Sequence, residues 1–112
     1  MHEYSATLEM IRIAEKYAAE RGADAVKKIN LVIGEESGYS GDAVRLYFDI
    51  IAAGTHCERA AIEIEEVAAK HKCASCGRLF VREPFSFVCP HCGGEARPTE
   101  IGREFYVKSV EI

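Results

Sequence analysis

Two Cys-x-x-Cys pairs constrain this chain more than any other feature of its sequence. The pairs are separated by twelve residues, and a glycine directly follows each one. Each pair can present two thiolates on one side of a tight turn, which suits a glycine at positive φ, and two facing turns complete a tetrahedral shell around zinc. The spacing therefore predicts a zinc-binding module whose ligands are Cys73, Cys76, Cys89 and Cys92.

Two other interpretations of the cysteines fit less well. Paired disulfides belong to an oxidising compartment, and a thioredoxin-type redox motif has one such pair rather than two matched ones. A shell closed by four sulfurs leaves no position for water or substrate, so zinc here is expected to be structural. A segment of about thirty residues buries too little to fold alone, so metal binding and folding are expected to be one event.

Length and charge limit the remaining classes of function. With 112 residues, the chain is long enough for one small domain that carries a smaller insert. It has no run of about 18 apolar residues and does not begin with a basic, then apolar, segment, so we expect neither a membrane span nor a signal peptide. The expected location is the cytoplasm. The net charge is −4, and no part of the chain is basic enough to predict nucleic-acid binding.

The hydrophobic pattern predicts two helices and three strands outside the cysteine segment. The helices are expected at residues 4–21 and 43–53, with Ser40 or Asp42 as the cap of the second, and the strands at 28–33, 61–67 and 104–112.

These elements predict an α+β fold with both helices on one face of a three-stranded sheet and an inserted, zinc-ribbon-like module with four cysteine ligands. Residues 1–69 together with 104–112 would form the α/β domain, and residues 70–103 the zinc-binding domain. The last strand would return to the sheet, which makes the cysteine segment an insertion rather than a tail.

The start of the chain offers a second set of metal ligands. The α-amine of Met1, the backbone amide of His2 and the imidazole of His2 lie within reach of one ion, and Glu3 could add its amide or its carboxylate. Planar coordination by nitrogen selects Ni(II) or Cu(II) over zinc or magnesium. A histidine at position two is common, however, and is usually only solvated.

The order of motifs resembles that of the HypA/HybF family of nickel metallochaperones. Members begin Met-His-Glu and continue with an amphipathic helix, a strand ending Ile-Gly (Ile33-Gly34) and a helix matched by residues 43–49. A Gly-Thr (residues 54–55), an Ile-x-Ile strand (residues 62–64) and two cysteine knuckles follow, the second written Cys-Pro-His-Cys-Gly. Glu35-Glu36 and Gly41 depart from the family pattern in the loop that joins the first strand to the second helix.

The resemblance implies a nickel carrier rather than an enzyme. It implies Ni(II) bound by Met1, His2 and Glu3, structural Zn(II), and delivery during maturation of nickel–iron hydrogenase, with urease as a further recipient for some relatives. The implied partners are a GTP-hydrolysing (HypB-like) accessory protein and the hydrogenase large-subunit precursor. Whether His71 or His91 joins a metal site, and whether the chain is a monomer or a homodimer, stays open.

Rival interpretations come from other classes of protein. The chain could be a zinc-ribbon adaptor for nucleic acid, without nickel, although its balanced charge disfavours this. Thiol–disulfide exchange at the cysteine pairs would make it an enzyme. The neighbours His56 and Cys57 could suggest a nucleophile and its base, but adjacent residues rarely orient that way, and Cys57 is expected to be an ordinary thiol.

Overall fold

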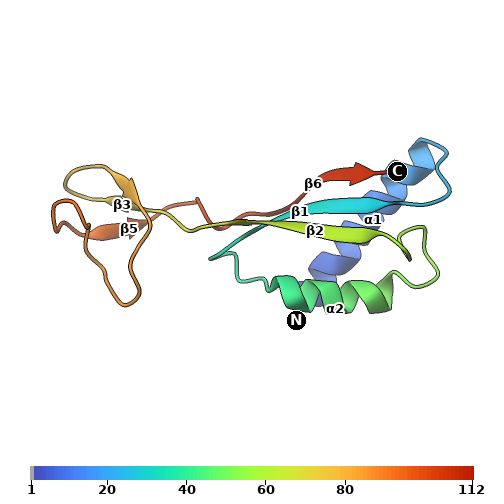
Figure 1. The fold of residues 1–112 in the computed structure, drawn as a ribbon, viewed down its shortest axis with the longest axis horizontal. Helices are drawn as coiled ribbons and strands as arrows, with labels where there is room; N and C mark the ends of the chain where they lie inside the picture. The colour runs from blue at the N-terminus through green and yellow to red at the C-terminus, as the bar shows by residue number, and fades with distance from the viewer. Residues whose placement is uncertain (1) are drawn as a thin grey trace.

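The structure is a computed structural model and describes residues 2–112. The chain forms two three-stranded sheets, which lie one after the other along the long axis of the molecule (Figure 1). The molecule measures 55 × 26 × 17 Å, with β3 and β5 at one end and both helices at the other (Figure 1). In chain order the elements are α1 (His2–Glu20), β1 (Lys28–Gly34), α2 (Gly41–Ile51), β2 (Ala61–Val67), β3 (His71–Cys73), β4 (Leu79–Phe80), β5 (Ala96–Pro98) and β6 (Phe105–Glu111).

The larger sheet has the strand order β2-β1-β6, with β1 parallel to β2 and antiparallel to β6. Alternate residues of the central strand, Ile29, Leu31 and Ile33, are buried in one cluster with both helices. Alternation in a strand sends these side chains to one face, so both helices cover that face. The predicted α+β fold is confirmed.

The helices meet the sheet through regularly spaced apolar residues. In α1 the side chains of Met10, Ala14 and Ala18 are buried, and in α2 those of Val44 and Phe48 are buried. This i, i+4 spacing gives each helix one apolar stripe, and the two alanines let α1 approach its neighbours closely. Neither helix within residues 2–112 combines the length and apolar character needed to cross a membrane.

The helix ends differ from the expected ones. The first helix begins at His2 rather than Tyr4, where Glu3 in its first turn suits the positive end of the helix dipole. The second helix spans Gly41–Ile51 rather than residues 43–53. Its N-cap is Ser40, whose Oγ accepts a hydrogen bond from the Ala43 amide at 3.3 Å.

The cysteine segment contains a second sheet, with the order β4-β3-β5, that the sequence did not predict. Its strands have two or three residues, too few to show a hydrophobic period. Its core consists of Cys73, Phe80 and Cys89, with Ala96 packed against them. So few buried side chains cannot stabilise a fold by themselves, which agrees with a module held together by metal.

Residues 34–36 bind the two connections that lead into and out of this small sheet. The Glu36 amide donates to the carbonyl oxygen of Gly102 at 2.7 Å, and a Glu35 carboxylate oxygen accepts from the Ala69 amide at 3.2 Å. A Cβ on Gly34 would lie 2.1 Å from the Gly102 oxygen, so these backbones touch. The last strand, β6, does return to the larger sheet as predicted. The division into two domains stays a prediction.

Candidate metal centres

The four predicted zinc ligands lie together at the end of the molecule formed by the small sheet. The sulfur atoms of Cys73, Cys76, Cys89 and Cys92 all lie within 4.8 Å of one another. The Cys73–Cys92 pair is 3.4 Å apart and the Cys76–Cys89 pair 3.9 Å apart. A tetrahedral zinc ion with Zn–S bonds of about 2.3 Å holds its sulfurs about 3.8 Å apart. The cluster therefore fits such an ion, and all five cysteines of the chain are free of disulfides.

Two equivalent turns carry these cysteines. In each turn the glycine that follows the pair has a positive φ, +75° at Gly77 and +76° at Gly93. Its amide donates to the carbonyl oxygen of the pair's first cysteine, at 3.0 Å to Cys73 and 2.9 Å to Cys89. An L side chain rarely adopts this backbone conformation, which explains why glycine follows each pair.

Backbone amides point at the sulfur of Cys73 and stabilise its thiolate. The amides of Cys76 and Ser75 each donate to this sulfur at 3.3 Å, and the hydrogen bonds, that of Cys76 first, lower the pKa of Cys73 to about 6. At Cys92 the largest single effect, the Gly94 amide, favours the thiolate. The sulfurs of the other three cysteines and burial together outweigh it and raise the pKa of Cys92 to about 11. Four sulfurs this close cannot all be anionic without a cation between them.

The two histidines of this segment lie outside the sulfur cluster. The buried ring of His71 directs Nε2 toward Glu36, with 3.6 Å between Nε2 and Oε1. At His91 the backbone amide, rather than the exposed ring, contacts the sulfur of Cys89, at 3.3 Å. Neither imidazole belongs to the group of four ligands found among the described residues.

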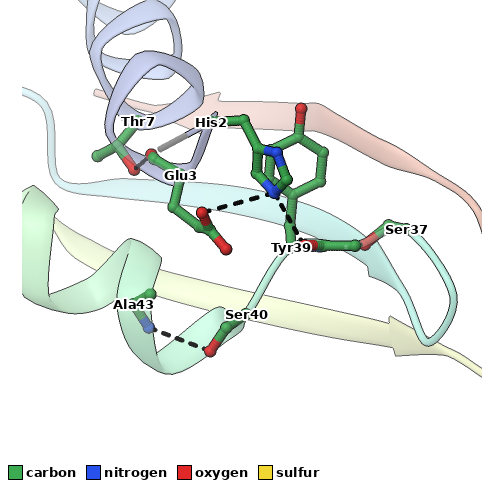
Figure 2. Close-up of polar contacts among 8 residues, drawn as sticks. His2, Glu3, Thr7, Ser37, Tyr39, Ser40 and Ala43 are labelled. Carbon is green, nitrogen blue, oxygen red and sulfur yellow. Dashed lines mark hydrogen bonds and ion pairs between the residues drawn. The ribbon is translucent and has the colours of Figure 1, made fainter.

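At the other predicted site, His2 lies at the first turn of α1 beside the loop that leads into α2 (Figure 2). Its Nε2 is 3.0 Å from the carbonyl oxygen of Gly38 and 3.5 Å from a carboxylate oxygen of Glu3. The imidazole packs on the ring of Tyr39, with centroids 4.6 Å apart. The third predicted ligand, Met1, lies outside the described residues.

The start of α1 leaves backbone donors available. The first amides of an α-helix have no acceptor within the helix, and those of His2 and Glu3 belong to this group. The carbonyl of Glu3, by contrast, accepts a hydrogen bond of 2.6 Å from the hydroxyl of Thr7. Because the amide nitrogens of His2 and Glu3 have no acceptor within the helix, they can bind a metal without breaking a helical hydrogen bond.

The contact between His2 and the loop of Gly38 was missed by sequence reasoning. A loop between the first strand and the second helix was expected, but His2 and Gly38 are 36 positions apart in the sequence. The family resemblance placed this loop between the first strand and the second helix but did not indicate its contacts.

Sequence comparisons point to one family. Over residues 1–112 the chain matches a family model described as hydrogenase/urease nickel incorporation, metallochaperone, hypA. A hydrogenase maturation factor HypA from Caldanaerobacter subterraneus subsp. tengcongensis is 38% identical, with 100% of this chain and 99% of the relative covered. Another from Dehalococcoides mccartyi is 36% identical, with 100% and 94% covered.

Two solved structures share the fold. The solution structure of the Ni metallochaperone HypA from Helicobacter pylori matches with a TM-score of 0.65 at 23% identity, covering 98% of this chain and 96% of that one. The solution structure of a HypA protein matches with a TM-score of 0.72 at 24% identity, covering 100% and 96%. At these identities the likeness supports the architecture alone.

Proposed function

The chain belongs to the HypA family of nickel-incorporation metallochaperones for hydrogenase maturation, and on this basis we propose that it binds Ni(II) at its N-terminus and delivers it to a nickel–iron hydrogenase. Members of this family are maturation factors, not enzymes, as the sequence predicted for this chain. The observation that carries the nickel site is the imidazole of His2, which contacts Gly38 and Tyr39, beside the first amides of α1, which have no acceptor within the helix.

The donor set that we propose is the α-amine of Met1, the amide and imidazole of His2, and the amide of Glu3. Four nitrogens in a plane suit Ni(II). The Glu3 carboxylate faces Nε2 of the His2 ring, which favours the Glu3 amide as the fourth donor. The positive end of α1 stabilises negative charge, so it lowers the cost of deprotonating two amides there.

A carrier must also release its ion. The side chain of His2 is 61% exposed, so an incoming partner can reach it. Nickel must displace protons from the amine and the amides, so its affinity falls as the pH falls. Donation to a recipient with its own ligands would then require only that the short terminal chelate open.

We propose that Zn(II) occupies the four-cysteine cluster and has a structural role. The support is the spacing of the sulfurs, the amide donors that favour a thiolate at Cys73, and a local core too small to fold without an ion. A saturated thiolate shell offers no open position for chemistry.

The proposed partners follow from the family. They are a GTP-hydrolysing, HypB-like accessory protein and the precursor of the hydrogenase large subunit, with no role for nucleic acid or membrane. Because the family description also includes urease, a urease precursor is a further candidate recipient. We place the protein in the cytoplasm, as a monomer or a homodimer.

Titration of the zinc-loaded, nickel-free protein with Ni(II) tests this proposal. We expect one tight equivalent for the wild type, at least about a hundredfold weaker binding for His2→Ala, and weaker wild-type binding in acid. The control is His91→Ala, which removes another exposed imidazole and should bind as the wild type does. If His2→Ala also binds one equivalent as tightly as the wild type, the proposed nickel site is wrong.

A further inference from the structure

The contact between His2 and Gly38 determines which nitrogen of the imidazole is free. A carbonyl oxygen can only accept a hydrogen bond, so the Nε2 that lies 3.0 Å from the Gly38 oxygen must carry the proton. The carboxylate of Glu3 lies on the same side of the ring, 3.5 Å from Nε2. With two acceptors at Nε2, the neutral ring keeps its lone pair on Nδ1.

Nδ1 is the nitrogen that a terminal nickel chelate needs. A metal held by the His2 amide closes a small ring to Nδ1 through Cα, Cβ and Cγ, whereas Nε2 lies on the far side of the imidazole. A ligating histidine commonly donates its other N–H to a carbonyl or carboxylate, which fixes the tautomer and the orientation of the ring. The Gly38 carbonyl has the geometry of such an outer partner.

Tyr39 fixes the plane of the same imidazole. The centroids of the two rings are 4.6 Å apart and the ring planes are inclined at 58° (Figure 2). The ring of Tyr39 also packs against the ring of Phe105 in β6, with 4.2 Å between the centroids. The Tyr39 amide donates to Ser37 Oγ at 3.1 Å, which closes the turn. The Tyr39 ring that contacts His2 is therefore itself packed against the larger sheet.

The backbone of Gly38 gives this turn its shape. Its φ of +83° lies in the region that L side chains rarely adopt, and a Cβ placed there would meet nothing within 4 Å. An alanine at this position would strain the backbone without a steric clash, so it tests the direction of the carbonyl rather than the space around it.

We propose that the turn formed by residues 37–39 is a positioning element for nickel capture, in which the Gly38 carbonyl leaves Nδ1 of His2 free and the Tyr39 ring holds the imidazole in place. This inference rests on the nickel site proposed above. The turn contributes no ligand of its own, and it acts by preparing His2 before the ion arrives.

Nickel titration of zinc-loaded variants tests the turn. Loss of an outer partner typically weakens metal binding about 10- to 100-fold, so we expect a loss of at least about tenfold for Tyr39→Ala and for Gly38→Ala. Tyr39→Phe keeps the ring and should bind as the wild type does. Gly54→Ala is the matched backbone control, because Gly54 has a φ of +79° with nothing within 4 Å and lies outside the turn.

Including His2→Ala in this series separates the two proposals. If His2→Ala loses nickel while Tyr39→Ala and Gly38→Ala bind like the wild type, the positioning role is wrong and the nickel site stands. If His2→Ala itself binds nickel like the wild type, the proposed nickel site is wrong, and the proposed positioning role of the turn is wrong with it.

A second measurement needs neither nickel nor a variant. The ¹⁵N shifts of the His2 ring, recorded on nickel-free protein at an alkaline pH where imidazole is neutral, report the tautomer directly. We expect a fully populated Nε2–H form in the protein, against a mixture in a free Met-His-Glu peptide. A peptide-like mixture in the folded protein, or a dominant Nδ1–H form, would overturn the inference even if Tyr39→Ala failed to fold.

Discussion

Cys57 lies inside the larger core, and its surroundings decide its chemistry. Its side chain is fully buried, and burial, followed by the nearby charge of Glu15, raises the pKa of Cys57 to about 11. The neighbouring His56 is turned toward Glu15, with 2.5 Å between Nδ1 and Oε2. The two adjacent residues therefore do not form a nucleophile and its base, and Cys57 is a packed, protonated thiol.

Alkylation kinetics test this placement of Cys57. At about pH 8, iodoacetamide should leave Cys57 of the native, zinc-loaded protein unmodified and should modify it rapidly after denaturation. Mass spectrometry of tryptic peptides would locate the adduct. Modification of native Cys57 at the rate of an exposed cysteine would contradict the buried position.

The same thiol makes stability depend on pH on the alkaline side. The folded-state pKa of Cys57 lies above the ordinary value of 9.0, so its contribution is fully present below pH 9 and is lost as the pH rises through about 11. The raised pKa of Cys57 corresponds to at most about 2–3 kcal/mol of stability. Urea unfolding should therefore show a steeper alkaline loss for the wild type than for Cys57→Ala, and parallel losses would argue against the shift.

At the scale of elements, the end of β1 is where the two sheets are joined. The amide of Gly34 donates to the Glu104 carbonyl at 2.7 Å, and its Cα faces the backbone of Gly102 so closely that a Cβ would lie 2.1 Å from the carbonyl oxygen. Both contacts involve backbone atoms, which cannot move aside as a flexible side chain can.

Gly34→Ala should therefore be costly. We expect it to lower the free energy of unfolding by at least about 2 kcal/mol, because the added methyl group must push two backbone segments apart. Gly22→Ala is a useful comparison, since Gly22 has a φ of +66° with nothing within 4 Å, so its replacement should cost only about 1 kcal/mol of backbone strain. Chemical denaturation of both variants would measure the difference in the free energy of unfolding. Equal losses of stability would contradict the prediction, because they would show that the backbone around Gly102 moves aside at little cost.

The sequence predicted elements best where the hydrophobic period was long enough. The strand Ala61–Val67 has the predicted bounds, because Ile62 and Ile64 alternate with glutamates. The strands of the cysteine segment were missed, since strands of two or three residues have no period to detect. Contacts between distant segments, such as His2 with Gly38 or Glu15 with His56, leave no local pattern at all.

For the candidate site residues too, local patterns could be predicted from the sequence and contacts between distant segments could not. The cysteine cluster could be predicted because the spacing within each pair is a property of the turn itself, and the structure does bring the four sulfurs together. The surroundings of His2 could not be predicted, because they depend on how the loop before α2 folds back over the start of α1.

At the scale of the whole molecule, the cysteine segment lies between two strands of the larger sheet. The chain leaves through β2 and returns through β6, which pairs with β1 in antiparallel register from Lys28 to Ile33. If the segment unfolds, β6 is held to the sheet across a long flexible loop, which costs closure entropy. Loss of zinc should therefore loosen the larger sheet as well as the small one.

Cys73→Ala tests this dependence. We expect the variant to lose zinc, and its larger sheet to unfold at a temperature lower by several degrees. Hydrogen exchange at the amides of Leu31 and Val107, which are paired across β1 and β6, would localise the effect. Wild-type protection of both amides in the zinc-free variant would show that the two modules are independent.

The most direct test of the whole account is nickel titration of the zinc-loaded protein beside a variant that carries one extra residue before Met1. The added residue keeps every side chain but converts the α-amine of Met1 into a peptide amide and displaces the terminal amine. The account predicts that the wild type binds one equivalent of Ni(II) tightly and that the extended variant binds at least about a hundredfold more weakly. Equal affinity in the two proteins would contradict it.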